Sequence, residues 1–224
     1  MKQIKIIIFI AVCSLSNISL ANNINGIWEG IFDINGHGEY DFTGLISSNL
    51  ATAYTEKAKV VYNGKIKTEK NKFKWNLLMY LQDGSSFGTA EIKGKIINNK
   101  VMSGKWVTEP AKDYGNIYLI KKSKEVVNTG EIINKKWTSY DGSSTHLLSI
   151  ENYKLSGLDA NGCNYYGDIK KLNKKIYGVK LEISSCGISD GFYEGMGHIK
   201  KNQEKNILIL NLTNKNFSVF IKLL

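Results

Sequence analysis

The sequence predicts an all-β protein of antiparallel meanders, and three observations support this. Apolar and polar residues alternate with a period of two, for example in 177–183, 208–212 and 217–223, which is the pattern of half-buried strands. Turn-forming residues recur about every ten positions, as expected for a meander of short strands. No window keeps apolar residues at the 3.6-residue spacing of a helix with end caps.

The first 21 residues resemble a secretory signal peptide. Lys2 and Lys5 precede an uncharged apolar run over 6–13, and the small-x-small pattern of 19–21 fits a cleavage site. The apolar run is shorter than the roughly 20 residues that a spanning helix needs. Lipidation at Cys13 is less favoured, because Val12 precedes it where a small residue is expected. We therefore expect export to the periplasm or to the extracellular side or cell surface, with no transmembrane segment after cleavage.

The expected N-terminal domain spans 22–123 and contains eight strand candidates. Dipeptides that accept positive φ separate several of them, as two-residue hairpin turns require; they are Asn35-Gly36, Asn63-Gly64, Asp83-Gly84 and Asn98-Asn99. The candidate strands are 26–33, 39–47, 53–62, 65–69, 73–82, 86–97, 101–108 and 115–122.

A charged linker at 124–130 is expected to lead into a C-terminal domain over 131–224, with a further turn at Asp141-Gly142. Its strand candidates are 131–140, 145–150, 153–158, 163–172, 176–185, 191–201, 205–213 and 217–223. Eight meandering strands favour closure into a barrel, which removes exposed edges. The interior of such a barrel is filled by side chains or holds one small ligand. We predict two small eight-stranded β-barrel-like domains; one long sandwich is the alternative.

The mature chain would keep two cysteines, Cys163 and Cys186, at the open end of one predicted hairpin. If Asn173 pairs with Ile176, the two cysteines face each other across the strands, within disulfide range. An oxidising compartment favours this bond. A catalytic thiol would need a neighbouring base, and zinc would need more ligands or a Cys-x-x-Cys spacing. We therefore predict a disulfide that pins the C-terminal domain.

Motifs for catalysis or metal binding are weak. Residues 187–191 match Gly-x-Ser-x-Gly, but a nucleophile elbow needs a helix after the serine, and a strand is predicted there. The histidines His37, His146 and His198 have no metal-binding spacing. Glu194 and His198 share a strand face and could form an acid–base pair, although a solvated face is the preferred interpretation. We expect no catalytic residue, no metal site, no cofactor and no enzymatic activity.

Aromatic residues and charge provide the candidate binding surface. Four aromatic side chains flank the predicted disulfide and are taken as binding candidates: Tyr165, Tyr166, Phe192 and Tyr193. The net charge of +10, mostly from lysine, favours an acidic protein or an anionic envelope component as partner. Nucleic acid is not expected, because the chain has no arginine-rich or aromatic-basic motif.

Two resemblances bear on the fold. The segments 155–169, 176–187 and 190–199, with both cysteines and the Tyr-x-Gly step at Tyr193–Gly195, resemble an uncharacterised β-domain of small exported proteins of Gram-negative bacteria. The Gly26-x-Trp28 start of the first meander is similar to calycin-type barrels, the lipocalin and avidin group. The resemblances imply export, the disulfide and an all-β fold; they imply no activity and transfer no ligand-binding residue.

These observations predict an exported, non-catalytic binding protein that acts by surface recognition. An inhibitor or immunity-type protein that neutralises a partner protein is one form of this function. Two alternatives stay open: a carrier of a small hydrophobic ligand inside a barrel, and an envelope hydrolase that uses Ser189 or His198.

Overall fold

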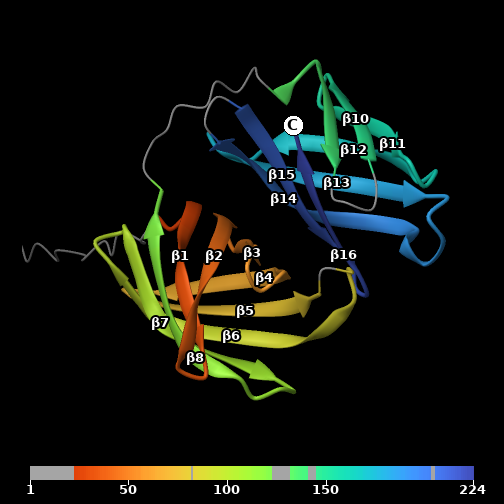
Figure 1. The fold of residues 1–224 in the computed structure, drawn as a ribbon. Coiled ribbons are helices and arrows are strands. Elements are labelled where there is room, and N and C mark those ends of the chain that lie inside the picture. The colour runs from red at the N-terminus through yellow and green to blue at the C-terminus, as the bar shows by residue number, and fades with distance from the viewer. Residues whose placement is uncertain (1–22, 82, 123–131, 141–144, 203–204) are drawn as a thin grey trace, which may run out of the picture.

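Two eight-stranded antiparallel sheets make up the protein. The computed structural model describes residues 23–81, 83–122, 132–140, 145–202 and 205–224. In this part of the chain the strands β1–β8 form a closed barrel, and β9–β16 form a second sheet of eight strands (Figure 1). The all-β prediction with two barrel-like units is therefore confirmed. The predicted signal peptide (1–21), the predicted linker (124–130) and the Asp141-Gly142 turn lie outside the described residues.

The first barrel is a meander in which each strand pairs with the next. Its pairing is completed between the first and last strands, from Trp28 opposite Lys121 to Phe32 opposite Ile117. Its strands are β1 (Gly26–Ile34), β2 (His37–Ser47), β3 (Leu50–Thr55), β4 (Val60–Glu69), β5 (Lys72–Tyr80), β6 (Ser86–Ile97), β7 (Val101–Glu109) and β8 (Tyr114–Lys121).

The turns of this barrel follow the sequence signals, with one exception. Asn35-Gly36 and Asn98-Asn99 adopt positive φ angles between paired strands, as predicted. The predicted turn at Asn63-Gly64 is wrong, because both residues lie within β4. At Gly64 the neighbouring strand comes so close that an added Cβ would lie 1.9 Å from the carbonyl oxygen of Asn76. The glycine therefore serves close strand packing.

The chain turns instead at residues 56–59, between β3 and β4. The carboxylate of Asp41 accepts hydrogen bonds from the backbone N–H groups of Glu56 and Lys57, each at 2.7 Å. The Thr55 hydroxyl accepts a third from the Ala58 N–H at 2.9 Å. These side-chain acceptors replace the glycine that the sequence analysis looked for.

The second sheet is almost a barrel. Its strands are β9 (Lys135–Tyr140), β10 (Thr145–Glu151), β11 (Lys154–Asp159), β12 (Asn164–Lys171), β13 (Ile176–Ser184), β14 (Gly191–Asn202), β15 (Lys205–Thr213) and β16 (Ser218–Leu223). Thr138 of β9 and Leu224, next to the end of β16, exchange two backbone hydrogen bonds of 3.2 and 2.7 Å. This single pair bridges the two edges and brings the sheet close to closure.

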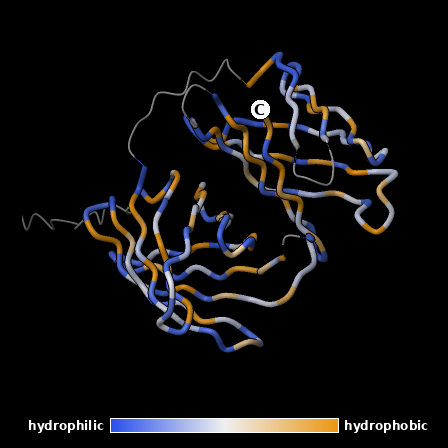
Figure 2. Tube along the Cα trace, in the orientation of Figure 1, coloured by the Kyte–Doolittle hydropathy of each residue, from blue (hydrophilic) through white to orange (hydrophobic). Residues whose placement is uncertain are grey.

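Each sheet encloses its own apolar core. Figure 2 shows hydrophobic and hydrophilic stretches interspersed along the strands of both sheets, as the period-two pattern requires. Trp28 and Trp75 are fully buried in the first core, and Trp137 and Tyr193 in the second.

The predicted disulfide joins Cys163 to Cys186, with Cα atoms 4.7 Å apart. The predicted register is wrong by one residue: Lys171 pairs with Tyr177 and Asn164 with Ser184, so the register would place Cys163 opposite residue 185. The Asn173 side chain accepts hydrogen bonds from the backbone of residues 175 and 176, which shapes a different turn. Positive φ at Ser185 then ends the strand, and Cys186 follows beside Cys163.

The outer face of the second sheet packs against the first barrel. Ile27 and Leu45 of β1 and β2 form one buried cluster with Ile176 and Met196 of β13 and β14. On the same face of β14, His198 is only 1% exposed. The solvated strand face predicted for this histidine is therefore wrong, because the first barrel covers it.

Polar contacts extend this barrel–barrel contact. The Tyr54 hydroxyl and His198 Nε2 lie 3.0 Å apart, and their rings stack. The Asn211 side-chain amide donates to the Ala53 carbonyl at 2.8 Å. Glu56 forms two ion pairs, with Lys200 at 2.9 Å and with Lys222 at 2.8 Å. Apolar packing and matched polar groups thus define one arrangement of the two sheets.

The buried histidine should make stability depend on pH. Burial lowers the pKa of His198 from 6.5 to about 4, so between these values the unfolded chain binds a proton that the folded protein does not. The stability contribution is therefore present above pH 6.5 and is lost as the pH falls towards 4. We expect a loss of about 2 kcal/mol between pH 7 and pH 5 in urea unfolding.

The matched variant is His198→Gln, which keeps a polar side chain but does not titrate. Between pH 7 and pH 5 the free energy of unfolding of this variant should fall by about 2 kcal/mol less than that of the unmodified protein. His37 and His146 are present in both proteins, so their contributions cancel in the comparison. Equal pH dependence in the two proteins would contradict the burial of His198.

The disulfide should contribute substantially to stability. It links residues 23 positions apart, and closing a loop of this length in the unfolded chain is worth about 3 kcal/mol on the chain-entropy model. Reduction should lower the free energy of unfolding by about this amount in chemical denaturation. The Cys163→Ser/Cys186→Ser double variant should match the reduced protein and should not respond to reductant; a response would show that another group is being reduced.

Candidate functional site

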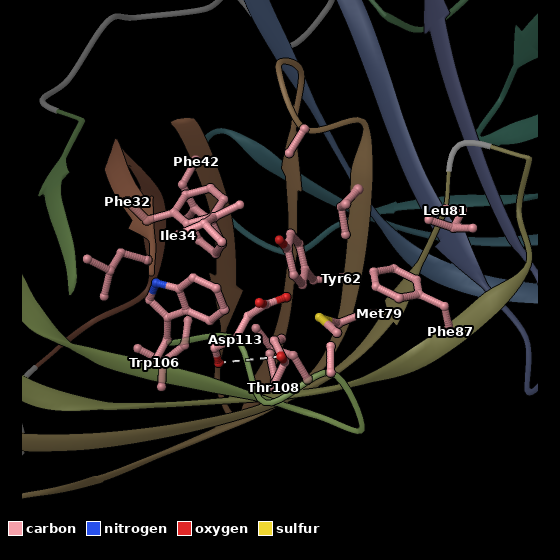
Figure 3. Close-up of a pocket in the computed structure, with 17 residues that line it drawn as sticks. Phe32, Ile34, Phe42, Tyr62, Met79, Leu81, Phe87, Trp106, Thr108 and Asp113 are labelled. Atoms are coloured by element: carbon pink, nitrogen blue, oxygen red, sulfur yellow. Dashed lines mark hydrogen bonds between the residues drawn. The ribbon is translucent and has the colours of Figure 1, made fainter. Parts of the chain in front are cut away.

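An apolar cavity of about 260 Å³ lies inside the first barrel. It is at the end of the barrel where β1–β2, β3–β4, β5–β6 and β7–β8 connect (Figure 3). Leu81 and Phe87 line it and are also exposed, so the cavity reaches the surface. The lining is mainly aromatic and aliphatic: Phe32, Ile34, Phe42, Ala58, Val60, Tyr62, Leu77, Met79, Leu81, Phe87, Ala90, Ile92, Trp106, Thr108, Ala111, Asp113 and Ile117.

The volume is sufficient for a small organic molecule. Engineered apolar cavities of roughly 150 Å³ stay dry and bind benzene. A cavity of about 260 Å³ can therefore hold a larger group, such as a fused pair of rings or a folded alkyl chain. Its predominantly apolar walls with a few polar groups are typical of ligand sites.

Side-chain size along the strands explains why the space is at one end. The opposite end is filled by Trp28, whose indole N–H donates to the Ile24 carbonyl at 2.8 Å, and the Lys121 ammonium lies 5.6 Å from its ring centre. Trp75 fills the interior next to it and meets Phe42 edge to face. Towards the cavity, alanine occupies lining positions that larger residues could take, at 58, 90 and 111. The sequence thus fills one half of the barrel and leaves the other half open.

Three polar side chains line this cavity: Tyr62, Thr108 and Asp113. Tyr62 is only 7% exposed, and its hydroxyl is directed into the cavity (Figure 3). Burial raises the pKa of Tyr62, so the phenol stays neutral. Thr108 donates to the Asp113 carbonyl at 3.4 Å. The Asp113 carboxylate accepts a hydrogen bond from the Asn35 side-chain amide at 2.8 Å.

The wall opposite Tyr62 is held by Asp33, near the end of β1. The Asp33 carbonyl accepts the indole N–H of Trp106 at 3.0 Å, which fixes the ring edge-on to Phe32. The Asp33 carboxylate accepts the backbone N–H of Asn116 at 2.9 Å. Backbone and side-chain hydrogen bonds from Asn116 lower the pKa of Asp33. The aromatic wall is therefore attached to two strands at once.

The second sheet contacts two of the loops around the cavity. In the β5–β6 loop, the Gly84 carbonyl accepts the Ser218 N–H at 2.8 Å, and Ser85 forms a β-bridge with Phe217. In the β3–β4 loop, Glu56 makes its ion pairs with two lysines of the second sheet. Burial acts to raise the pKa of Glu56, but the hydrogen bonds and charges of those two lysines together outweigh it, so the pKa is lowered. The barrel–barrel contact therefore helps to position the cavity entrance.

The four aromatic residues predicted to bind a partner do not form one patch. Tyr165 and Tyr193 are buried in the second core, where their hydroxyls donate to Asp159 and to the Ser189 carbonyl. Tyr166 and Phe192 are 59% and 74% exposed on the outer face. Consecutive residues of a strand point to opposite faces, so neighbours such as 165 and 166 cannot share a surface.

The candidate hydrolase residues are not brought together either. Gly187–Ser189 form a 3₁₀ turn between β13 and β14, so a strand follows Ser189, as the sequence predicts. Glu194 pairs with Lys180 at 3.0 Å, whereas His198 contacts Tyr54 at the barrel–barrel contact. Ser189, Glu194 and His198 therefore form no nucleophile–base pair. A serine hydroxyl and a histidine do meet elsewhere in the described chain: Ser139 Oγ lies 2.8 Å from Nδ1 of the buried His146, and Asp159 lies 4.0 Å from its Nε2.

Sequence reasoning did not single out the cavity residues. The alternation along β4, β6 and β7 identifies which side chains point inward, and these include Tyr62, Ala90 and Trp106. It does not show how completely those side chains fill the space. Among the lining residues the small ones are Ala90 in β6 and Ala58 and Ala111 in turns, which form no recognisable sequence pattern.

Comparisons with known proteins provide little further information. No protein-family model and no curated protein matches the chain. The fold is similar to the crystal structure of a "putative outer membrane protein" from Bacteroides fragilis, with 11% identity and a TM-score of 0.32 over 89% of this chain and 96% of that one. This likeness is too weak to transfer any property, and neither the calycin nor the Gram-negative β-domain resemblance is confirmed. Within the described residues, no helix is long and apolar enough to cross a membrane.

The assignment of Phe192 to the exposed face and of Tyr193 to the buried face of β14 can be tested by measuring the free energy of unfolding of two variants. Phe192→Ala should change the free energy of unfolding by less than about 0.5 kcal/mol, because the ring is exposed. Tyr193→Ala should cost about 3 kcal/mol or more, because it removes a fully buried ring. Urea denaturation of both variants measures the difference. Similar losses at these adjacent positions would contradict the assignment of their faces.

Proposed function

We propose that the protein is a non-catalytic binding protein whose β1–β8 barrel holds a small apolar molecule. The observation that carries this proposal is the cavity of about 260 Å³ with aromatic and aliphatic walls. Ligand sites are usually concave and mostly apolar, with a few placed polar groups. Tyr62, Thr108 and Asp113 are such groups in this cavity.

This proposal replaces surface recognition as the preferred function. The four predicted binding residues were Tyr165, Tyr166, Phe192 and Tyr193. Two of them, Tyr165 and Tyr193, are buried, so only Tyr166 and Phe192 are available to a partner at the surface. Inhibition of a partner protein and binding to an acidic partner stay predictions. The carrier alternative requires space inside a barrel, and that condition is met.

We also propose that the protein works outside the cytoplasm, in the periplasm or at the cell surface. The Cys163–Cys186 disulfide supports this location, because such bonds persist in oxidising compartments. A ligand carrier or sensor in the cell envelope would combine these two proposals.

A neutral apolar fluorophore, N-phenyl-1-naphthylamine, can test ligand binding. We expect saturable binding with increased probe emission and a change in tryptophan fluorescence, because Trp106 lines the cavity. Ala90→Phe places a ring in the cavity from an inward position of β6 and should weaken binding about tenfold or more, a loss of about 1.4 kcal/mol.

The matched control is Thr89→Phe, which adds the same ring at the adjacent, exposed position of the same strand. It should bind the probe as the unmodified protein does. Circular dichroism shows whether both variants fold. Equal binding by a folded Ala90→Phe variant would refute the cavity as the binding site.

A further inference from the structure

We infer that the cavity prefers a ligand with an apolar body and a cationic head group, such as a protonated alkylamine. This inference rests on the proposed function and specifies the class of ligand. Three independent features of the cavity and its entrance support it: a carboxylate in the lining, a tyrosine hydroxyl that faces the cavity, and the distribution of charge around the barrel.

The first feature is the carboxylate of Asp113. It is the only ionisable acid or base other than Tyr62 among the residues that line the cavity. It accepts one hydrogen bond from the Asn35 amide at 2.8 Å, and a carboxylate has room for several more. Figure 3 shows the Asp113 and Tyr62 side chains directed into the cavity. An ammonium group at this place would be attracted, and a carboxylate ligand would be repelled.

The second feature is the hydroxyl of Tyr62. It is held within the cavity wall, where the ring packs against Phe42 with centroids 5.6 Å apart. The hydroxyl is not one of the fully buried polar atoms of the described residues that lack a partner; it faces the cavity, where a ligand can reach it (Figure 3). An ammonium has three donors and no acceptor. It can therefore donate to the neutral Tyr62 oxygen and to the Asp113 carboxylate.

The third feature is the reversed charge at the entrance. We define the mouth loops as the described residues 33–39, 56–59, 81, 83–85 and 109–113; the opposite end comprises 67–74, 95–101 and 121–122. The mouth loops carry six carboxylates, Asp33, Glu39, Glu56, Asp83, Glu109 and Asp113, against three lysines, Lys57, Lys59 and Lys112. The opposite end carries eight lysines, Lys67, Lys70, Lys72, Lys74, Lys95, Lys100, Lys121 and Lys122, against one acid, Glu69.

This local excess of acidic residues contrasts with the whole chain, whose net charge is +10. Two of the three mouth lysines have local partners: Lys112 pairs with Glu109 at 2.6 Å, and Lys57 donates to the Glu39 carbonyl at 3.2 Å. Glu56 in turn is paired with lysines of the second sheet. With these two lysines counted, six carboxylates face five ammonium groups at the entrance, a small negative excess, whereas the opposite end is strongly positive. The difference between the two ends favours a cation at the entrance.

The apolar part of the ligand has a separate place. Leu81 and Phe87 form an exposed apolar rim on the β5–β6 side, and Figure 3 shows them at the far side of the cavity from Trp106. Met79 and Leu77 continue the apolar wall inward. A head group near Asp113 and Tyr62 thus leaves the remaining volume for a hydrocarbon chain or ring.

A matched ligand series tests the head group. Decylamine, decanol and decanoate share one hydrocarbon length and differ in charge, and each can compete with N-phenyl-1-naphthylamine below its micelle concentration. We expect decylamine to bind at least about tenfold more tightly than decanoate, as a charge-assisted hydrogen bond provides. Decanol should be intermediate.

Two substitutions assign the preference to residues. Asp113→Asn keeps the shape and removes the charge, and should reduce the decylamine preference about tenfold or more while leaving decanol affinity within about twofold. Glu109→Gln is the matched control, since Glu109 is an exposed mouth carboxylate outside the cavity lining; it should keep the preference. Tyr62→Phe should weaken decylamine and decanol several-fold, yet leave the probe unaffected. It serves as a second variant if Asp113→Asn does not fold.

The outcomes separate the inference from the proposed function. Tighter binding of decanoate, equal binding of all three ligands, or an unchanged preference in Asp113→Asn would overturn the inference, while probe binding would still support the cavity as a ligand site. If neither the probe nor any of the three ligands binds, both the proposed function and the inference fail.

Discussion

Pairing of β1 with β8 is the constraint on which the rest of the first barrel depends. Once the sheet is closed, every second side chain of eight strands must enter one interior of fixed width. Such an interior is usually filled, and here the buried indoles of Trp28 and Trp75 fill one end. Beyond these two indoles, the inward-facing side chains together do not fill the interior of the barrel. The number of strands fixes the width of the interior, and the cavity is the part of that interior that the side chains do not occupy.

Two features of the entrance depend on the second sheet. The β5–β6 loop and the β3–β4 loop both lie at the cavity, and both contact residues of β14–β16 through hydrogen bonds or ion pairs. The same contact buries Met196 and His198 on what is otherwise the outer face of that sheet. The second sheet therefore does more than extend the chain, because it restricts loops that a single barrel would leave unsupported.

Much of this fold follows from local sequence patterns. Alternation located most strands to within a few residues, since one buried face per sheet imposes a period of two. Turn residues were reliable where the backbone itself required positive φ, as at Asn35-Gly36. They failed where side chains from a distant strand made the turn, because the acceptors on Asp41 act across 15 residues. The hairpin register was wrong by one because an asparagine side chain changed the turn.

The site was less predictable for a physical reason. A cavity is a property of summed volumes in three dimensions, whereas the sequence shows only which positions face inward. The burial of His198 was also missed, because its strand face is polar enough to suit water, and only contact between two separate sheets removes that water. Both failures concern packing between distant elements. The disulfide was found because it depends on one hairpin.

The hydrogen bond from Ser218 to Gly84 makes the β5–β6 loop at the cavity entrance part of the contact between the two sheets. Equilibria that share a structural element are reciprocal: whatever tightens one tightens the other by the same free energy. A ligand that contacts the β5–β6 loop, as proposed above, would therefore stabilise the contact between the two sheets. Separation of the two sheets would, by the same coupling, weaken the binding of that ligand.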